Sequence, residues 1–330
     1  SAASDVYKRQ PEMLAMVENL KVWFPLRRAL LDVIRRRPSP YVKAVDGVSL
    51  DVRHGEVLAL AGESGCGKTT LGKTFLRLYA PTGGTIYYKP SEETLEKLKA
   101  IDEVSTRLPQ YMLDSGHIDI FKLPETAFRL LRREIQMIWQ DPFGSLDPRK
   151  TILESLMEPL EIHGIGESRT DRFEMILRSL EDVKLTPPED FAYRYPHMLS
   201  GGQRQRVVIA RVMLLRPRLV IADEPVSMLD VSIRAEILRL LMSLKEKFDL
   251  TYIFITHDLA LARYISNRLA IMYLGRIVEL GDTESILKEP LHPYTRALIE
   301  SIPQPDPKRR FTLHEPPIKG EVPTPINIPS

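Results

Sequence analysis

Glycines, hydroxyl-bearing residues and a lysine occur together early in the chain, as Gly62, Glu63, Ser64, Gly65, Cys66, Gly67, Lys68 and Thr69, followed by Thr70. Their spacing fits the phosphate-binding pattern G-x-x-x-x-G-K-S/T at every fixed position. Glycines let backbone N–H groups turn inward as an anion-binding nest, and the start of a helix adds its positive dipole. Lys68 should then reach the β- and γ-phosphates of a nucleotide, and the Thr69 hydroxyl should hold Mg²⁺. The stretch predicts nucleotide binding.

A second group of candidate residues follows the apolar run from Arg218 to Ala222, which is typical of a buried strand. Asp223 is placed to bind Mg²⁺ through water, and Glu224 to polarise the attacking water in a hydrolysis reaction. Acidic residues often end strands, so this pair carries little weight alone. Combined with the phosphate loop, it predicts nucleotide hydrolysis.

The stretch Leu199-Ser200-Gly201-Gly202-Gln203 contains another set of hydroxyl and glycine residues, at a predicted helix start. Ser200, Gly201 and Gly202 could form a nest suited to a γ-phosphate; taken alone, they would more often be a helix cap and a turn. Because one chain already has a phosphate loop, a second anion site suggests that two chains enclose ATP between them.

Two further polar residues end predicted strands. Gln140 follows Glu134 to Trp139, and its amide can bond both Mg²⁺ and a water. His257 follows Leu250 to Thr256 and could hydrogen-bond the γ-phosphate, or be an ordinary strand-end histidine.

Aromatic residues near the start could stack on the nucleotide base. Trp23, Phe24 and Tyr41 are the candidates, and for each of them core packing is an equal alternative.

The hydrophobic pattern and the turn residues of the sequence predict the strands and helices that position these residues. Glu56 to Ala61 is a short buried strand, and Thr69 to Leu78 a helix, so the phosphate loop has the strand-then-helix setting that it requires.

The arginine-rich segment 27–37 could meet anionic lipid or a partner, although a solvated loop is the alternative that we favour.

From about Met13 to about Pro290, the sequence resembles the ATP-binding cassette (ABC) ATPases. The motifs occur in the family's order: the phosphate loop, Gln140, the signature Leu199–Gln203, Asp223 with Glu224, Ser227–Asp230 and His257. The resemblance implies ATP and Mg²⁺ as cofactors and a dimer in which each site pairs one subunit's phosphate loop with the other's signature. Asp230 would then cross the dimer interface, or else cap the helix that begins near Val231.

Three stretches are similar to the ATPases of oligopeptide and dipeptide importers: Trp139–Arg149, Val226–Ser232 and Pro290–Leu298. Some members of that group import oligosaccharides. The similarity implies a subunit on the cytoplasmic face of the cell membrane that hydrolyses ATP. Its implied partners are a second ATPase subunit, identical or different, two permease subunits and, indirectly, an extracytoplasmic solute-binding protein. Relatives often carry a cysteine cluster for iron–sulfur beyond a segment like Glu321–Ser330; this sequence contains no such cysteines.

The fold class expected is α/β: a P-loop NTPase core with a mixed sheet, an antiparallel β subdomain and an α-helical signature subdomain. Residues 1–10 are interpreted as a non-native leader, 11–87 as the antiparallel β subdomain and P-loop core, and 88–133 as a helical insertion. Residues 134–215 are assigned to the Q-loop and signature subdomain and 216–288 to the second half of the core. Ten of the 26 prolines lie at or beyond Pro290, so 289–330 is expected to be an irregular, extended region.

Composition bears on the alternatives. The only cysteine is Cys66, so no disulfide framework is possible. No apolar run has the length of a membrane span, which predicts separate permease chains.

A soluble ABC ATPase acting on nucleic acid or ribosomes is the competing hypothesis. Against it stand one phosphate loop, no sustained heptads and a net charge of +2, so no nucleic-acid partner is expected. Intact Lys68, Glu224 and His257 argue against a third hypothesis, a regulatory cassette that does not hydrolyse ATP.

Overall fold

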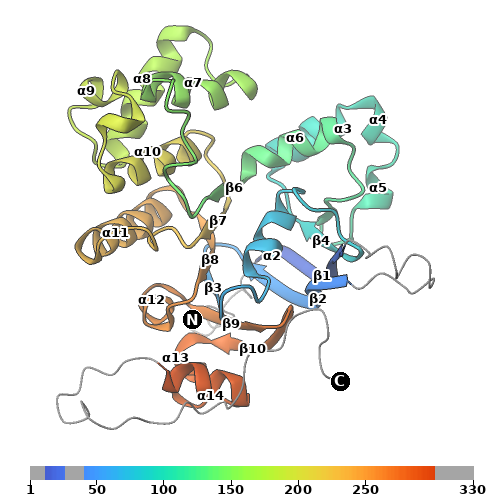
Figure 1. Cartoon of the computed structure of the whole chain (residues 1–330). Helices are drawn as coiled ribbons and strands as arrows, with labels where there is room; N and C mark the ends of the chain where they lie inside the picture. Colours follow the sequence, from blue (N-terminus) through green and yellow to red (C-terminus); the bar gives the residue numbers. More distant parts are fainter. Residues whose placement is uncertain (1–11, 27–40, 302–330) are drawn as a thin grey trace, which may run out of the picture.

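The computed structural model describes residues 12–26 and 41–301 (Figure 1). The predicted leader, the arginine-rich segment and residues 302–330 of the proline-rich region lie outside the described residues. Two sheets form the centre of the molecule, with helical groups on either side. Among the described residues, no helix is long and apolar enough to cross a membrane.

The first sheet is antiparallel, as expected for the start of the chain. It contains β1 (Met13–Pro25), β2 (Tyr41–Arg53), β4 (Gly83–Tyr88) and β5 (Ile118–Asp119), in the order β2-β1-β4-β5. The alternation of buried and exposed positions along β1 and β2 directs one face of these strands into the core.

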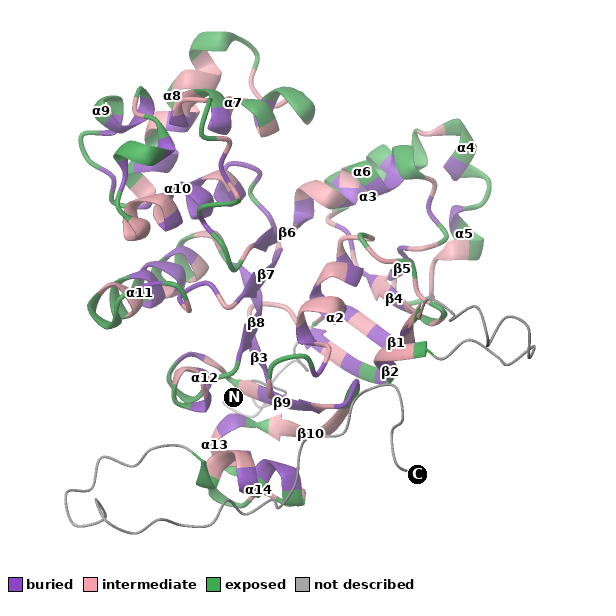
Figure 2. Cartoon of the chain, viewed as in Figure 1, coloured by how far each residue is buried: buried purple, intermediate pink, exposed green. Residues whose placement is uncertain are grey.

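The second sheet has the order β10-β9-β3-β8-β7-β6. These strands are β10 (Arg276–Asp282), β9 (Arg268–Tyr273), β3 (Val57–Ala61), β8 (Thr251–Thr256), β7 (Leu219–Asp223) and β6 (Ile135–Ile138). The neighbours from β9 to β6 are parallel, and β10 is antiparallel to β9, which confirms the predicted mixed sheet. Every residue of β3, β7 and β8 is buried, because elements cover both faces of the sheet (Figure 2).

A helical group shares one apolar cluster with residues of the parallel strands β3, β6, β7 and β8. It contains α7 (Ile152–Ile162), α8 (Arg169–Asp182), α9 (Pro188–Ala192), the 3₁₀ turn Pro196–Met198, α10 (Gly201–Met213) and α11 (Val231–Phe248). Helix α11 begins at Val231, as the sequence predicts. A capping box starts α7, because Thr151 Oγ1 accepts from the Glu154 N–H and Glu154 accepts from the Thr151 N–H.

The predicted helical insertion contains α3 (Glu92–Lys99), α4 (Asp102–Ser105), α5 (Leu108–Tyr111) and α6 (Glu125–Glu134). Its buried Glu134 accepts from Tyr88 Oη at 3.0 Å and from the Ser91 N–H, and this ties the helices to the antiparallel sheet. Strand β5 was not predicted from the sequence, because a strand of two residues is too short to show an alternating pattern.

The C-terminal expectation was partly wrong. Pro293–Glu300 forms helix α14, after α13 (Thr283–Lys288), rather than an extended segment. Pro293 occupies the first helical position, where its missing N–H costs nothing, and Tyr294 and Ala297 are buried. Proline content therefore gave the wrong prediction for these eight residues.

Candidate active site

The four parallel strands β3, β8, β7 and β6 end at one edge of the sheet, and each delivers a predicted site residue there. Helix α2 (Lys68–Phe75) begins at the same edge. A cavity of about 590 Å³ opens there. It is lined by Ala44, Gly62, Glu63, Ser64, Gly65, Gly67, Lys68, Thr69, Thr70, Gln140, Glu224, His257 and Leu298.

The phosphate loop has a backbone that requires glycine at two points. A Cβ on Gly67 (φ 108°) would lie 1.9 Å from the Ala44 carbonyl oxygen, and one on Gly62 (φ 152°) 2.2 Å from the Met272 carbonyl oxygen. Both contacts are with backbone atoms, which cannot rotate away. The loop therefore folds tightly against β2 and β9, with Gly65 facing open space.

The polar groups of the loop fit a polyphosphate. The Lys68 side chain is buried, and its Nζ donates to the carbonyl oxygens of Gly62 (2.8 Å) and Glu63 (2.7 Å). Within the described residues, the backbone N–H groups of Ser64, Gly65 and Gly67 donate to no protein acceptor. A lysine and several available N–H groups at a helix start form a donor set for an anion.

Cys66 lies beneath the loop rather than in the cavity wall. It is buried, and its Sγ lies 3.5 Å from Lys68 Nζ. Burial raises the pKa of the Cys66 thiol, so the side chain stays neutral and acts as packing.

Thr69 lines the cavity and contacts Asp223, which is not itself part of the cavity wall. Thr69 Oγ1 donates to Asp223 Oδ1 at 3.0 Å, and the Asp223 side chain is nearly fully buried. Burial raises the pKa of Asp223 above its ordinary value, and the neighbouring Glu224 adds to the rise. A nearby cation would relieve both effects.

Glu224 is held on both sides. Gln140 Nε2 donates to Glu224 Oε2 at 3.1 Å, and His257 Nδ1 lies 3.0 Å from Glu224 Oε1. The Glu224 backbone has φ 44°, an unfavourable conformation for a residue with a side chain. Local strain and two polar partners fix the direction of this carboxylate toward the cavity, and the three residues come from three different strands.

The signature residues lie outside the cavity wall. Ser200 Oγ accepts from the Gln203 N–H at 3.3 Å, and Gln203 Oε1 accepts from the Ser200 N–H at 3.0 Å, so the pair forms a capping box for α10. Gly201 and Gly202 form its first turn. Asp230 is exposed at the N-cap position of α11 and makes no side-chain cap bond. Within one chain, the helix-cap alternative therefore describes Ser200 and Gln203.

The aromatic candidates do not reach the cavity wall. Phe24 packs edge-on against Tyr79, with 5.1 Å between ring centroids, and Tyr41 lies 6.1 Å from the Trp23 ring. Leu298 and Ala44 line the cavity instead, and neither was a sequence candidate. Base stacking by Phe24 or Tyr41 stays a prediction.

A family model described as "ABC transporter" matches residues 45–227, more than half of the chain. The chain belongs to the ABC transporter family. A second family model, for the C-terminal region of oligopeptide/dipeptide transporters, matches residues 278–330.

Similar proteins cover most of this ABC ATPase. The oligopeptide transport ATP-binding protein AppF of Bacillus subtilis is 43% identical over 319 residues, which is 96% of this chain and 87% of AppF. YkfD of the same species, a putative oligopeptide transport ATP-binding protein by name, is 44% identical over 88% of this chain and 79% of its own. A solved dimer of the ATP-binding cassette MJ0796, bound to ADP and Pi, matches with a TM-score of 0.62 and 25% identity over 82% of this chain and 99% of that one.

Proposed function

We propose that this ABC ATPase is the ATP-hydrolysing subunit of a membrane importer for oligopeptides or dipeptides. The similarity to AppF, an oligopeptide transport protein by name, over 96% of the chain carries the proposal. The match of residues 278–330 to the C-terminal region of peptide transporters supports the same substrate class. The relatives are named as transport or import proteins, which does not favour the nucleic-acid alternative.

The geometry supports the hydrolytic roles that we propose for these residues. Lys68 and the loop N–H groups would hold the phosphates. Glu224, fixed by Gln140 and His257, would accept a proton from the attacking water. His257, whose side chain is 58% exposed at the cavity, can also turn toward a γ-phosphate. When bound, ATP would provide the phosphoanhydride bond to be broken, and Mg²⁺ would neutralise charge on its phosphate oxygens.

The residues present fit Mg²⁺ bound together with a nucleotide. In residues 12–26 and 41–301, no group of three or more His, Cys, Asp or Glu side chains could hold a metal. Mg²⁺ usually takes one or two protein groups and completes its shell with phosphate oxygens and water. Thr69, Asp223 and Gln140 are the residues proposed to hold it.

A second ATPase subunit, identical or different, would complete each site. The signature Ser200–Gln203 lies outside the cavity formed by its own chain, so the proposed pairing places it against a partner's phosphate loop. Asp230 is exposed near it, as an interface residue must be. The solved MJ0796 cassette is itself dimeric.

Permeases would dock in a hollow beside the strand that leads to Gln140. This cavity of about 220 Å³ lies between the core and the helical group, and its wall includes Leu76, Trp139, Ile162 and Arg211. A concave, partly apolar surface at this place is what a permease helix needs. Two permease subunits and, beyond them, an extracytoplasmic solute-binding protein would complete the transporter, with this subunit on the cytoplasmic face of the membrane.

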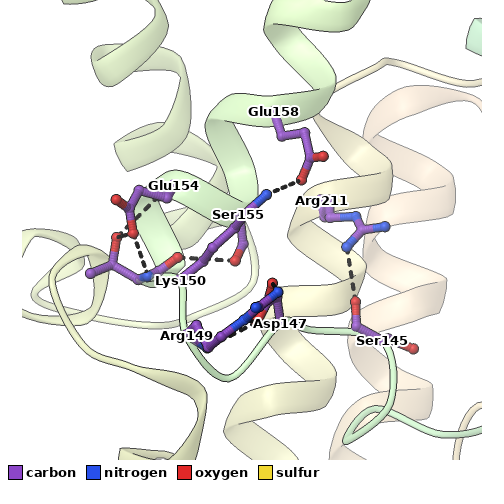
Figure 3. Close-up of polar contacts among 9 residues, drawn as sticks. Ser145, Asp147, Arg149, Lys150, Glu154, Ser155, Glu158 and Arg211 are labelled. Carbon is purple, nitrogen blue, oxygen red and sulfur yellow. Dashed lines mark hydrogen bonds and ion pairs between the residues drawn. The ribbon is translucent and has the colours of Figure 1, made fainter.

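The segment after Gln140 connects the nucleotide cavity with this hollow. Arg211 Nη1 donates to the Ser145 carbonyl at 2.9 Å, which ties the segment to α10 (Figure 3). Further along, Asp147 pairs with Arg149, and Lys150 with Glu158 at 3.2 Å. A segment fixed in this way can transmit a displacement of Gln140 to a docked helix.

Uptake of a labelled oligopeptide tests the proposal. In cells without the native gene, the wild-type chain should restore uptake, and Glu224→Gln at equal abundance should not. Uptake of a labelled oligosaccharide, measured in parallel, serves as the specificity control. Oligopeptide uptake that does not depend on the gene would contradict the substrate assignment, and full uptake with Glu224→Gln would contradict the catalytic one.

A further inference from the structure

Helix α14 contacts the phosphate loop directly. Tyr294 Oη accepts a hydrogen bond from the Glu63 N–H at 3.0 Å, across 231 positions of sequence. The Tyr294 ring is 4% exposed and packs on Tyr273, with 4.3 Å between ring centroids. Burial raises the pKa of the Tyr294 hydroxyl, so it stays neutral and can accept from the amide.

The turn before Tyr294 is hydrogen-bonded to β10. The N–H groups of Leu291 and His292 donate to the two carboxylate oxygens of Glu279, at 2.9 and 3.3 Å. His292 Nδ1 then accepts from the Tyr294 N–H at 3.1 Å and caps the helix. Arg296 Nε donates to the Pro290 carbonyl at 2.8 Å. These bonds fix the start of α14 relative to the sheet and so fix the direction of the Tyr294 side chain.

The same helix reaches the nucleotide cavity one turn later. Leu298 stands four residues after Tyr294, on the same helical face, and lines the cavity together with the loop. The C-terminal turn and helix, residues 290–298, thus supply both a support beneath the loop and part of the cavity wall.

We propose that Tyr294 is a positioning residue of the nucleotide site, which fixes the first turn of the phosphate loop through the Glu63 amide. The proposal rests on nucleotide binding at this loop. It gives a physical role to the Pro290–Leu298 stretch, because docking of α14 and nucleotide binding then stabilise each other. By reciprocity, a bound nucleotide should protect α14 from local opening to the same extent that α14 strengthens nucleotide binding.

The test compares Tyr294→Phe with Tyr273→Phe in the full chain. Both substitutions keep an aromatic ring at the ring–ring contact, but only the first removes the acceptor for Glu63. Affinity for a non-hydrolysable ATP analogue should fall about three- to tenfold in Tyr294→Phe, the fold-change expected from one neutral hydrogen bond. It should stay within about twofold of the wild type in Tyr273→Phe, and kcat at saturating ATP should hardly change in either variant.

Hydrogen exchange provides a second readout. The Glu63 amide should exchange faster in Tyr294→Phe, and the analogue should slow exchange in 293–300 of the wild type but less so in the variant. Unchanged affinity and unchanged Glu63 exchange in Tyr294→Phe would overturn the proposal, as would equal losses of affinity in both variants. Because binding is measured without turnover, an inactive but ATP-binding chain would count against the hydrolytic roles and leave this test intact.

Discussion

The two segments of this ABC ATPase that are predicted to bind phosphate share residue types but differ in what surrounds them. The phosphate loop lies at the ends of four parallel strands, with a buried lysine and a carboxylate held on two sides. The signature starts a helix, and its Ser200 and Gln203 side chains bond each other's backbone. One segment thus lines the candidate active-site cavity, and the other begins a helix outside it.

This difference agrees with the proposal that two chains are needed to complete each ATP site. A phosphate-binding nest needs donors that converge, and convergence at the loop comes from the sheet beneath it. The signature residues Ser200–Gln203 do not line the cavity of their own chain, so we expect their donors to act only when another surface faces them. We expect changes at the loop to act within one chain and changes at the signature to act across two.

The largest effect is expected from Glu224→Gln. Loss of the proposed general base should lower kcat for ATP at least about 100-fold, with ATP binding retained. The variant should also accumulate as a dimer in ATP, because the closed state is no longer released by hydrolysis. Phosphate release and light scattering measure the two effects. Glu284→Gln, on the surface and paired with Arg263, is the control; near-normal turnover in Glu224→Gln would refute the assignment.

Mixing two inactive variants tests whether the phosphate loop of one chain works with the signature of another. Lys68→Ala disables the loop, and Gly201→Glu places a carboxylate at the signature, where a Cβ meets only ordinary contacts. If sites are shared in a self-dimer, mixed dimers keep one intact site, and an equal mixture should regain about a quarter of wild-type activity. Each variant alone should stay inactive. No recovery, in a wild-type chain that is active as a homodimer, would mean that each chain uses its own signature.

A smaller effect separates the two signature glycines. A Cβ on Gly202 would lie 2.7 Å from Ile233 Cγ2, whereas one on Gly201 meets nothing closer than 3.6 Å. Gly202→Ala should therefore lower the free energy of unfolding by about 1–2 kcal/mol through overpacking between α10 and α11. Gly201→Ala is the matched control and should be close to neutral. Urea denaturation measures both, and equal stabilities would show that Ile233 moves aside freely.

The smallest effect concerns Asp223 and pH. Its pKa is raised in the folded state, so above pH 3.8, the ordinary value, the folded protein retains a proton that the unfolded chain has lost. The stability that neutral Asp223 confers is therefore lost as pH rises from 3.8 through the raised pKa of the folded state. Asp223→Asn should abolish that part of the decline and raise Tm near neutral pH, in the absence of Mg²⁺ and ATP. Exposed Asp249→Asn is the control; parallel pH profiles of Asp223→Asn and the wild type would contradict the prediction.

Most catalytic candidates could be predicted because their signals are local. Gly67, Lys68 and Thr69 fit a short pattern, and Glu224 follows an apolar strand. Continuous apolar runs likewise predicted buried parallel strands, since burial on both faces imposes that pattern. Helix α14 was mispredicted because the proline content is an average over residues 289–330. This average does not distinguish a proline at the first position of a helix, such as Pro293, from one that prevents a helix.

The sequence alone determined which residues can bind phosphate and activate water, because backbone conformation and side-chain chemistry are properties of a few adjacent residues. The tertiary structure decided which of them meet. Gln140, Glu224 and His257 converge because parallel strands end at one sheet edge. Tyr294 reaches Glu63 because α14 packs under that edge. Contacts between residues this distant in the chain depend on the packing of the whole core, which no local pattern contains.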